Sequence, residues 1–394
     1  MLTSLAFIFL TGMVLGWVFK KIKLPGLLGM IITGMLIGPY GLNLLDSSIL
    51  TISPDLRRLA LIIILTRAGL SLDISDLKRV GRPAVLMCFL PACFEIMGMV
   101  VMAPRLLGVS VLDATIMGAV VGAVSPAVVI PKMLYLIDNN YGTDKSIPQM
   151  IMAGASVDDV FVIVMFTAFV DLAQGGSFSP ADFLQIPISI ITGPVVGAII
   201  GIGSVYFFKR VHIRDSAKVI IILSISFLLI AIEDWPKNIV PFSGLLAVMS
   251  LSAALQKKDR DVALRLSSKF SKLWVGAEIM LFVFVGATVD LKYAAIAGLP
   301  TVFVILIASV FRMVGVYLCM LKTKINFKER VFCMIAYIPK ATVQAAIGSI
   351  PLSLGLPCGN TVLTVAVLAI LITAPLGAFG VDMTHKKLLV KENK

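Results

Sequence analysis

The sequence predicts an all-α polytopic membrane protein with about thirteen transmembrane helices, and three observations carry this prediction. Hydrophobic residues make up 59% of the 394 residues, charged residues only 14%, and mean hydropathy is +1.01, which is far more apolar than a soluble domain. Apolar stretches that can cross about 30 Å of hydrocarbon recur along almost the whole chain. The basic residues gather in short segments between these stretches. The sequence therefore leaves no room for a separate soluble domain.

The apolar runs define each expected span by length. The first run, from Leu2 to Phe19, has no basic segment before it and is followed by Lys20, Lys21 and Lys23, so we expect a retained helix and not a cleaved signal. The expected spans are 2–19, 25–38, 57–72, 84–106, 111–136, 146–171, 183–208, 217–232, 239–255, 268–288, 293–320, 330–354 and 360–380.

Basic residues orient these spans. With the N-terminus outside, 26 of the 34 basic residues fall on inner loops or the tail, including Lys78, Arg79, Lys394 and the stretch 257–272, and five, Lys237 among them, fall outside. The positive-inside rule then predicts an outer N-terminus and a cytoplasmic C-terminus, and the short loops favour a bacterial inner membrane. The net charge of +12 is thus an orientation signal, which excludes a nucleic-acid-binding protein.

Two adjacent carboxylates, Asp158 and Asp159, lie in the middle of one apolar run, GASVDDVFVIV. An acidic residue at the centre of a membrane helix costs roughly 2.5–3.5 kcal/mol even on lenient scales, so such residues indicate ion or proton sites. Burial and mutual repulsion both disfavour two ionised neighbours, which makes protons exchangeable there. Carboxylate oxygens also suit a hard cation. Because His212 and His385 fall in an inner loop and the tail, a histidine proton relay across the membrane is excluded.

The chain repeats itself with opposite topology. GLSLD at 69–73 matches GATVD at 286–290, and GLL at 26–28 matches GLL at 244–246, with offsets of 217 and 218. The first pair falls on spans that run in opposite directions, a pattern typical of secondary transporters. We therefore expect inverted repeats of about 1–171 and 217–380, with a connector helix of about 183–208.

The same offset relates Glu95 to Arg312. Equivalent helices meet at a pseudo-two-fold axis, so an intramembrane ion pair between these residues is expected, either purely structural or moving with transport. Lys340 is central in its span, where it either joins this charge network or snorkels to an interface. Ser125 is either a cation ligand or a local backbone hydrogen-bonder.

Two spans at corresponding positions contain prolines. Pro126 and Pro131 lie in one span, and Pro339 and Pro351 lie in its counterpart. Proline removes a backbone donor and clashes with the preceding turn, so both helices are expected to be interrupted near the midplane. Two broken helices at matching positions, with freed carbonyls and half-helix ends, are the pattern of a transport site.

These motifs together resemble the monovalent cation:proton antiporter superfamily, and most closely the two-aspartate sodium/proton antiporters of the NHA type. The resemblance rests on SVDDV, VSPAVV and PKATVQAAIG and covers nearly the whole chain. It implies a homodimer that exchanges Na⁺ or Li⁺ for H⁺ by an elevator-like motion. It also implies an ion-carrying core of about 57–171 and 268–380 and a dimerisation part of about 1–38 and 183–255.

The resemblance assigns roles residue by residue. Asp158 and Asp159 become carriers of the ion and proton, Ser125 a site ligand, and Glu95, Arg312 and Lys340 the surrounding network. Electrogenic relatives carry a lysine where this chain has Arg312, and an arginine does not release its proton. Either Lys340 supplies a second exchangeable proton, or the exchange is electroneutral, which we favour.

No cofactor, nucleotide or enzymatic activity is expected, and lipids are the expected surroundings. Two alternatives were weighed against the antiporter. A sodium-coupled symporter of organic anions would share the inverted-repeat core. An intramembrane aspartyl protease needs two aspartates that face each other, whereas adjacent helical residues diverge by about 100°.

Overall fold

In the computed structural model, every element except one isolated backbone bridge is helical in the residues that the structure describes. These are 1–22, 24–71, 81–174, 180–211, 213–233, 242–289 and 291–392, without the side chains of Ser156, Val160, 180–190, Glu233 and 291–297. Several residues used above lie outside this set: Lys23, Asp73, Lys78, Arg79, His212, Lys237, Asp290 and Lys394.

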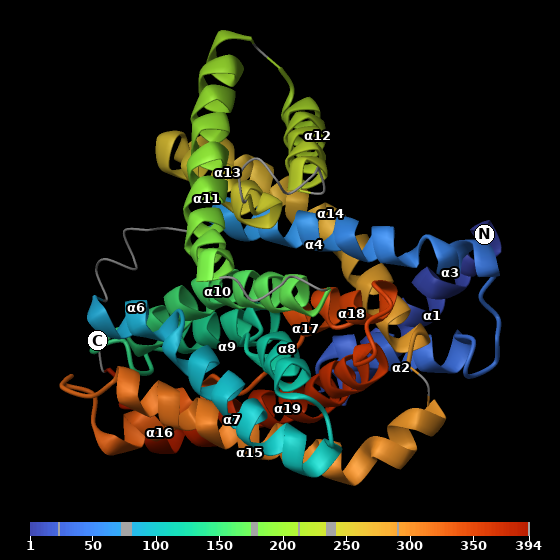
Figure 1. Ribbon diagram of the computed structural model, residues 1–394. Helices are drawn as coiled ribbons and strands as arrows, with labels where there is room; N and C mark the ends of the chain where they lie inside the picture. The colour runs from blue at the N-terminus through green and yellow to red at the C-terminus, as the bar shows by residue number, and fades with distance from the viewer. Residues whose placement is uncertain are drawn as a thin grey trace. The chain divides into compact units, whose positions relative to one another are not determined.

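The helices follow one another in the order shown in Figure 1, and each expected span overlaps one helix or one interrupted helix. Their bounds are α1 Leu2–Lys21, α2 Gly26–Ile37, α3 Ser47–Thr51, α4 Ser53–Ser71, α6 Arg82–Met87, α7 Leu90–Leu107, α8 Val111–Val121, α9 Pro126–Asp138, α10 Ile147–Ala173, α11 Pro180–Arg210, α12 Asp215–Glu233, α13 Gly244–Lys258, α14 Arg260–Ala287, α15 Leu291–Cys319, α16 Phe327–Ala336, α17 Thr342–Ile347, α18 Ile350–Ser353 and α19 Gly359–Leu388.

Helix ends follow local sequence signals. Ser110 and Asp113 form a capping box at the start of α8, and Asn326 and Glu329 form another at the start of α16, which satisfies backbone donors that a helix leaves free. The short α3, which lies outside the expected spans, is capped at its N-terminus by Asp46. This side chain accepts a hydrogen bond from Ser48, and that interaction lowers the pKa of the Asp46 carboxyl.

The protein is an all-α polytopic membrane protein, as predicted. Among the described residues, nine helical segments are long and apolar enough to cross a membrane by length and composition. They are Leu2–Lys21, Arg82–Leu107, Val111–Asp138, Ile147–Ala173, Ile191–Arg210, Asp215–Ile232, Arg260–Ala287, Gly298–Cys319 and Gly359–Leu388. The number of thirteen crossings therefore stays a prediction.

The chain divides into two compact units. The first comprises Met1–Pro54, Ser75–Gln174 and Leu281–Lys394, and the second comprises Asp55–Ile74 and Gly175–Met280. All the predicted site residues belong to the first unit. The assignment of chain segments to an ion-carrying core, a dimerisation part and two repeats stays a prediction.

In the first unit, α7 packs along α15 and α8, and α10 packs against α8 and α9 (Figure 1). Close backbone contact between α2 and α14 requires glycine. A Cβ on Gly34 would lie 1.9 Å from the Val283 carbonyl oxygen, and one on Gly286 would lie 2.0 Å from that of Ile31. These distances are too short for any side chain, so glycine sets the approach of the two helices.

In the second unit, α11 packs along α13, and α12 also contacts α13. The glycine repeat of α11 lies at this contact, since a Cβ on Gly193, Gly197 or Gly201 would lie within 2.6 Å of a carbonyl oxygen of Ser243, Ala247 or Leu251. Small residues spaced four apart let two helices approach closely, and these contacts show that α11 and α13 do so.

Both predicted helix interruptions are present. The first separates α8 from α9 at residues 122–125, and the second separates α16 from α17 at 337–341. Pro126 begins α9 and Pro339 lies in the second break, while Pro351 begins α18 after a further short gap. Pro131, which shares the first interrupted span with Pro126, lies inside α9, and the helix continues through it. Proline fits the start of a helix, where its missing donor has no intrahelical partner.

Candidate cation and proton site

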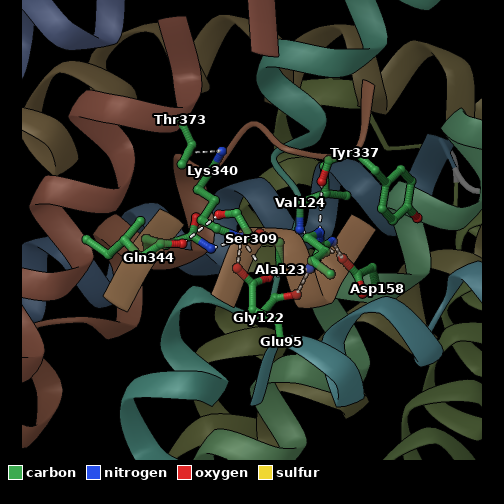
Figure 2. A network of polar contacts seen from close by, with 12 residues as sticks. Glu95, Gly122, Ala123, Val124, Asp158, Ser309, Tyr337, Lys340, Gln344 and Thr373 are labelled. Atoms are coloured by element: carbon green, nitrogen blue, oxygen red, sulfur yellow. Dashed lines mark hydrogen bonds and ion pairs between the residues drawn. The ribbon is translucent and has the colours of Figure 1, made fainter. Parts of the chain in front are cut away.

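Four charged side chains meet beside the two helix breaks. Glu95 on α7, Asp158 on α10, Arg312 on α15 and Lys340 in the second break have exposed fractions of 1% or less. In Figure 2, Lys340 and Asp158 lie on opposite sides of the first break, which runs through Gly122, Ala123 and Val124, and Glu95 is labelled below it. All four come from chain segments of the first unit.

The expected ion pair between Glu95 and Arg312 is present, with Nη1 2.9 Å from Oε2. Arg312 also pairs with Asp158, with Nη2 2.8 Å from Oδ2. Lys340 does not snorkel, since its Nζ lies 2.6 Å from Glu95 Oε1 and 2.7 Å from Oε2. The four formal charges sum to zero, which explains how they are tolerated in an apolar interior.

Arg312 also occupies freed carbonyls of both broken helices. Its Nε donates to the Tyr337 carbonyl at 2.8 Å, and its Nη1 donates to the Gly122 carbonyl. Gly122 follows the last residue of α8 and Tyr337 follows the last residue of α16. The C-terminus of a helix carries partial negative charge, so one guanidinium stabilises two half-helix ends. These two carbonyls are therefore occupied by the protein itself.

The two breaks are also joined directly. The backbone N–H of Ser125 donates to the Pro339 carbonyl at 2.7 Å, and Gln344 Nε2 donates to the Ala123 carbonyl at 2.9 Å. The backbone N–H of Lys340 donates to Thr373 Oγ1 at 3.0 Å. A hydrogen bond thus links the break of one predicted repeat to that of the other.

Sequence reasoning missed three residues of this network. Tyr337 acts through its backbone carbonyl, for which the sequence holds no signal. Gln344 and Thr373 are polar residues in apolar segments, at 0% and 1% exposure. Their polarity beside a predicted break was the available signal, because a buried polar group needs a partner.

The two aspartates have different surroundings. Asp158 Oδ2 accepts hydrogen bonds from the Val124 N–H at 2.8 Å and from Arg312. Asp159 is 8% exposed, and no described basic side chain forms an ion pair with it. In the described part of the chain, Asp158 Oδ1, Asp159 Oδ1 and Ser125 Oγ are buried oxygens without hydrogen-bond partners. The site therefore contains one carboxylate beyond the balanced set of four charges.

Such an arrangement can bind and release positive charge. An ionised Asp159 has no compensating cation in the balanced network, so a proton or a small cation provides the compensation. The free oxygens of Asp158 and Ser125 are ligands of the type that hard cations prefer. The fold and the site together define a class: an all-helical membrane protein with a cation-compatible charged site at two broken helices, the pattern of a secondary transporter.

Comparisons with known proteins agree. The transmembrane model of the sodium/hydrogen exchanger family matches residues 5–387. Human sodium/hydrogen exchanger 9B2 is 32% identical over 386 residues, which cover 93% of this chain and 70% of that protein. Human sodium/hydrogen exchanger 9B1 is 30% identical over 410 residues, which cover 99% and 78%. The chain belongs to the sodium/hydrogen exchanger family, within the monovalent cation:proton antiporter superfamily that its motifs resemble.

A solved structure shows the same fold. The sodium proton antiporter MjNhaP1 from Methanocaldococcus jannaschii, at pH 8, superposes with a TM-score of 0.86 at 21% identity, with 98% of each chain covered. At this identity the likeness concerns the fold alone. Family membership and fold together support cation/proton antiport as the general activity of the chain, which is an integral multi-pass membrane protein.

Proposed function

We propose that this protein exchanges Na⁺ or Li⁺ for H⁺, with Asp158 and Asp159 as the groups at which cation and protons compete. Alternating access then carries the loaded site between the two sides by an elevator-like motion. Family membership supports the exchange reaction, and the geometry of the aspartates supports the choice of residues.

One observation carries this proposal: Asp159 is the carboxylate outside the charge-balanced set. Glu95 and Asp158 are matched by Arg312 and Lys340 at distances of 2.6–2.9 Å. A buried carboxylate without a counter-charge is strongly unfavourable unless it is protonated or holds a cation. Asp159 therefore alternates between these two occupied states.

The neighbouring oxygens complete a ligand set of the expected chemistry. Asp158 Oδ1 and Ser125 Oγ are buried and free of hydrogen bonds from the described residues. The backbone N–H of Ser125 also forms a hydrogen bond to the second break, which fixes the position of the backbone that carries the Ser125 hydroxyl. We propose that a dehydrated Na⁺ or Li⁺ binds these oxygens together with Asp159.

We favour a one-for-one, electroneutral exchange. Arg312 stays charged, and it keeps Asp158 paired. Lys340 is held by both oxygens of Glu95, so its proton is engaged in an ion pair. Under this proposal one carboxylate exchanges one cation for one proton in each cycle.

The remaining expectations form part of the same proposal. We propose a homodimer in a lipid membrane, with the N-terminus outside, the C-terminus in the cytoplasm and a bacterial inner membrane as its location. The ion-carrying core comprises about 57–171 and 268–380, and the dimerisation part about 1–38 and 183–255. We propose that no cofactor or nucleotide takes part. We also propose that the protein cleaves no peptide bond, because adjacent aspartates on a helix point in different directions and do not face each other.

The test is ²²Na⁺ uptake into proteoliposomes against an imposed pH gradient, with Li⁺ and K⁺ as competitors. We expect uptake that depends on the gradient and that Li⁺ inhibits. Asp159→Asn is expected to abolish it, whereas Arg105→Gln, an exposed basic residue in the last turn of α7, should leave it unchanged. Undiminished uptake in both Asp158→Asn and Asp159→Asn would rule out the proposal. Na⁺-driven uptake of a labelled organic acid would favour a symporter instead.

A further inference from the structure

The peptide group that joins Ala123 to Val124 is held from both sides. Its carbonyl oxygen accepts a hydrogen bond from Gln344 Nε2 at 2.9 Å, and its N–H donates to Asp158 Oδ2 at 2.8 Å. Figure 2 shows both contacts at the first helix break. The orientation of this single peptide plane therefore decides whether a donor or an acceptor faces Asp158.

The flanking peptides are held by other groups. Arg312 binds the Gly122 carbonyl, and the Ser125 N–H donates to the Pro339 carbonyl. Gln344 is the side chain that binds the carbonyl side of the plane between them. It is fully buried, and its Oε1 has no hydrogen-bond partner in the described residues. In the described residues, the Gln344 side chain forms its hydrogen bond to the Ala123 carbonyl.

We propose that Gln344 is a positioning residue that keeps the Ala123 carbonyl out of the ligand shell of the transported cation. It thereby sets the affinity of the site and its preference between Na⁺ and Li⁺. The inference rests on the proposed function, because it takes Asp158 and Asp159 as the cation site. In this proposal the Gln344 side chain binds neither the cation nor the proton and acts only through the Ala123 carbonyl.

The physical reason lies in the carbonyl that Gln344 satisfies. A buried carbonyl without a donor costs about 1–3 kcal/mol, so loss of the glutamine amide favours rotation of the plane toward another partner. After that rotation the oxygen lies on the Asp158 side, within reach of a cation held there, because the Val124 nitrogen is already 2.8 Å from Asp158. Backbone carbonyls replace hydration water efficiently.

An extra carbonyl ligand does not affect the two ions equally. Larger hard cations accept more oxygen ligands than smaller ones, so Na⁺ gains more than Li⁺. A more tightly held cation also leaves the site more slowly. Transport needs binding that is weak enough for release, so tighter binding lowers the maximal rate. Loss of Gln344 therefore strengthens binding while it slows turnover.

The experiment compares Gln344→Met, of similar shape and without a donor, with wild type in reconstituted vesicles. We expect the KM for Na⁺ to fall about 2- to 10-fold, the range that a typical net hydrogen-bond free energy gives. The ratio of the Na⁺ KM to the Li⁺ KM should fall as well, with a lower maximal rate. The Na⁺-dependent rise in melting temperature of the purified protein gives the affinity independently of transport.

Thr364→Val is the matched control. Thr364 is a buried residue of α19 whose hydroxyl donates to its own helix at the Asn360 carbonyl, so this variant loses a buried donor whose hydrogen bond is confined to α19. It should keep both KM values. If Gln344→Met is not recovered folded, Gln344→Leu is measured with the same expectation.

A purely structural role for Gln344 predicts a different result. In that case Gln344→Met raises the KM for Na⁺ and the KM for Li⁺ together, or lowers the melting temperature without any change in the ratio of the two KM values. Either outcome, or unchanged kinetics, overturns the inference. Asp158→Asn and Asp159→Asn in the same assay keep the two questions apart, because undiminished exchange in both variants removes the proposed function and not only the role of Gln344.

Discussion

Arg312 and Glu95, which are 217 residues apart in the sequence, form a fully buried ion pair, with Nη1 2.9 Å from Oε2. The same guanidinium binds Asp158 and the carbonyls that end two half-helices. Arg312 thus combines two functions that are separate in most proteins: it neutralises buried carboxylates and it caps broken helices. Its fork of five donors suits this combination, whereas the compact ammonium of lysine does not.

Replacement of Arg312 should therefore be strongly destabilising. Arg312→Met leaves Asp158 without its cation and two helix-end carbonyls without donors. We expect a loss of about 3–5 kcal/mol, the usual effect of removing one partner of a buried ion pair. Thermal unfolding of the purified protein measures it, with the exposed Arg105→Met as control, which should stay within about 0.5 kcal/mol. Equal stability of the two variants would contradict this role of Arg312.

Replacing the two aspartates should have different effects on stability, although under the proposed function both take part in the exchange. Asp158→Asn removes the charge that Arg312 binds, so we expect it to lose about 3 kcal/mol as well as activity. Asp159→Asn removes a carboxylate with a buried unpartnered oxygen and should unfold at or above the wild-type temperature. Melting curves at one Na⁺ concentration and one pH test the difference. A greater loss in Asp159→Asn than in Asp158→Asn would reverse our assignment.

Sequence reasoning reached the charged residues because each breaks an otherwise apolar pattern. A charged side chain inside a membrane helix is energetically unfavourable unless it has a partner. This holds for Asp158, Asp159, Glu95, Arg312 and Lys340. The repeat offset of 217 residues predicts the pairing of Glu95 with Arg312 from the sequence alone. Proline marked the breaks for a similar reason, since Pro126 and Pro339 cannot continue an ordinary helix.

The part that sequence reasoning could not reach is carried by the backbone. The carbonyls of Gly122 and Tyr337 and the peptide between Ala123 and Val124 have no side-chain signature, and their partners depend on how two distant breaks cross. Proline patterns also do not fix where a break falls: Pro131 lies within α9, because a helix can continue past one missing donor when its other hydrogen bonds remain.

We also expect that each transport cycle moves no net charge across the membrane. If Asp159 alone exchanges one cation for one proton, a sudden Na⁺ jump should give no steady transport current in reconstituted membranes. Lys340→Ala should behave in the same way if Lys340 acts only as the ion-pair partner of Glu95, as the electroneutral proposal requires. Wild-type current that disappears in Lys340→Ala would instead assign a second exchangeable proton to this lysine.

Gly154 on α10 leaves room for the Tyr337 hydroxyl. A Cβ at this position would lie 2.5 Å from Tyr337 Oη and 2.8 Å from Met87 Cβ, closer than side-chain carbons approach other atoms. Tyr337 donates from its hydroxyl to the Met87 carbonyl at 3.1 Å and accepts from Arg312 at its own carbonyl. A displaced Tyr337 moves the carbonyl that binds Arg312. Asp158 lies one helical turn after Gly154 on the same helix, so a shift of α10 at Gly154 also moves Asp158.

Gly154→Ala should therefore lower both stability and exchange. We expect a loss of about 1–3 kcal/mol, as for other overpacked interiors, together with slower Na⁺ uptake in proteoliposomes. Gly203→Ala on α11 is the matched control, because in the described part of the chain its added Cβ meets nothing within 4 Å beyond the adjoining residues and backbone of its own helix. Alanine is the better helix former by up to about 1 kcal/mol, so this control should be at least as stable as wild type and equally active. If Gly154→Ala matches the control in both measurements, Tyr337 is not the group that holds Arg312 in place.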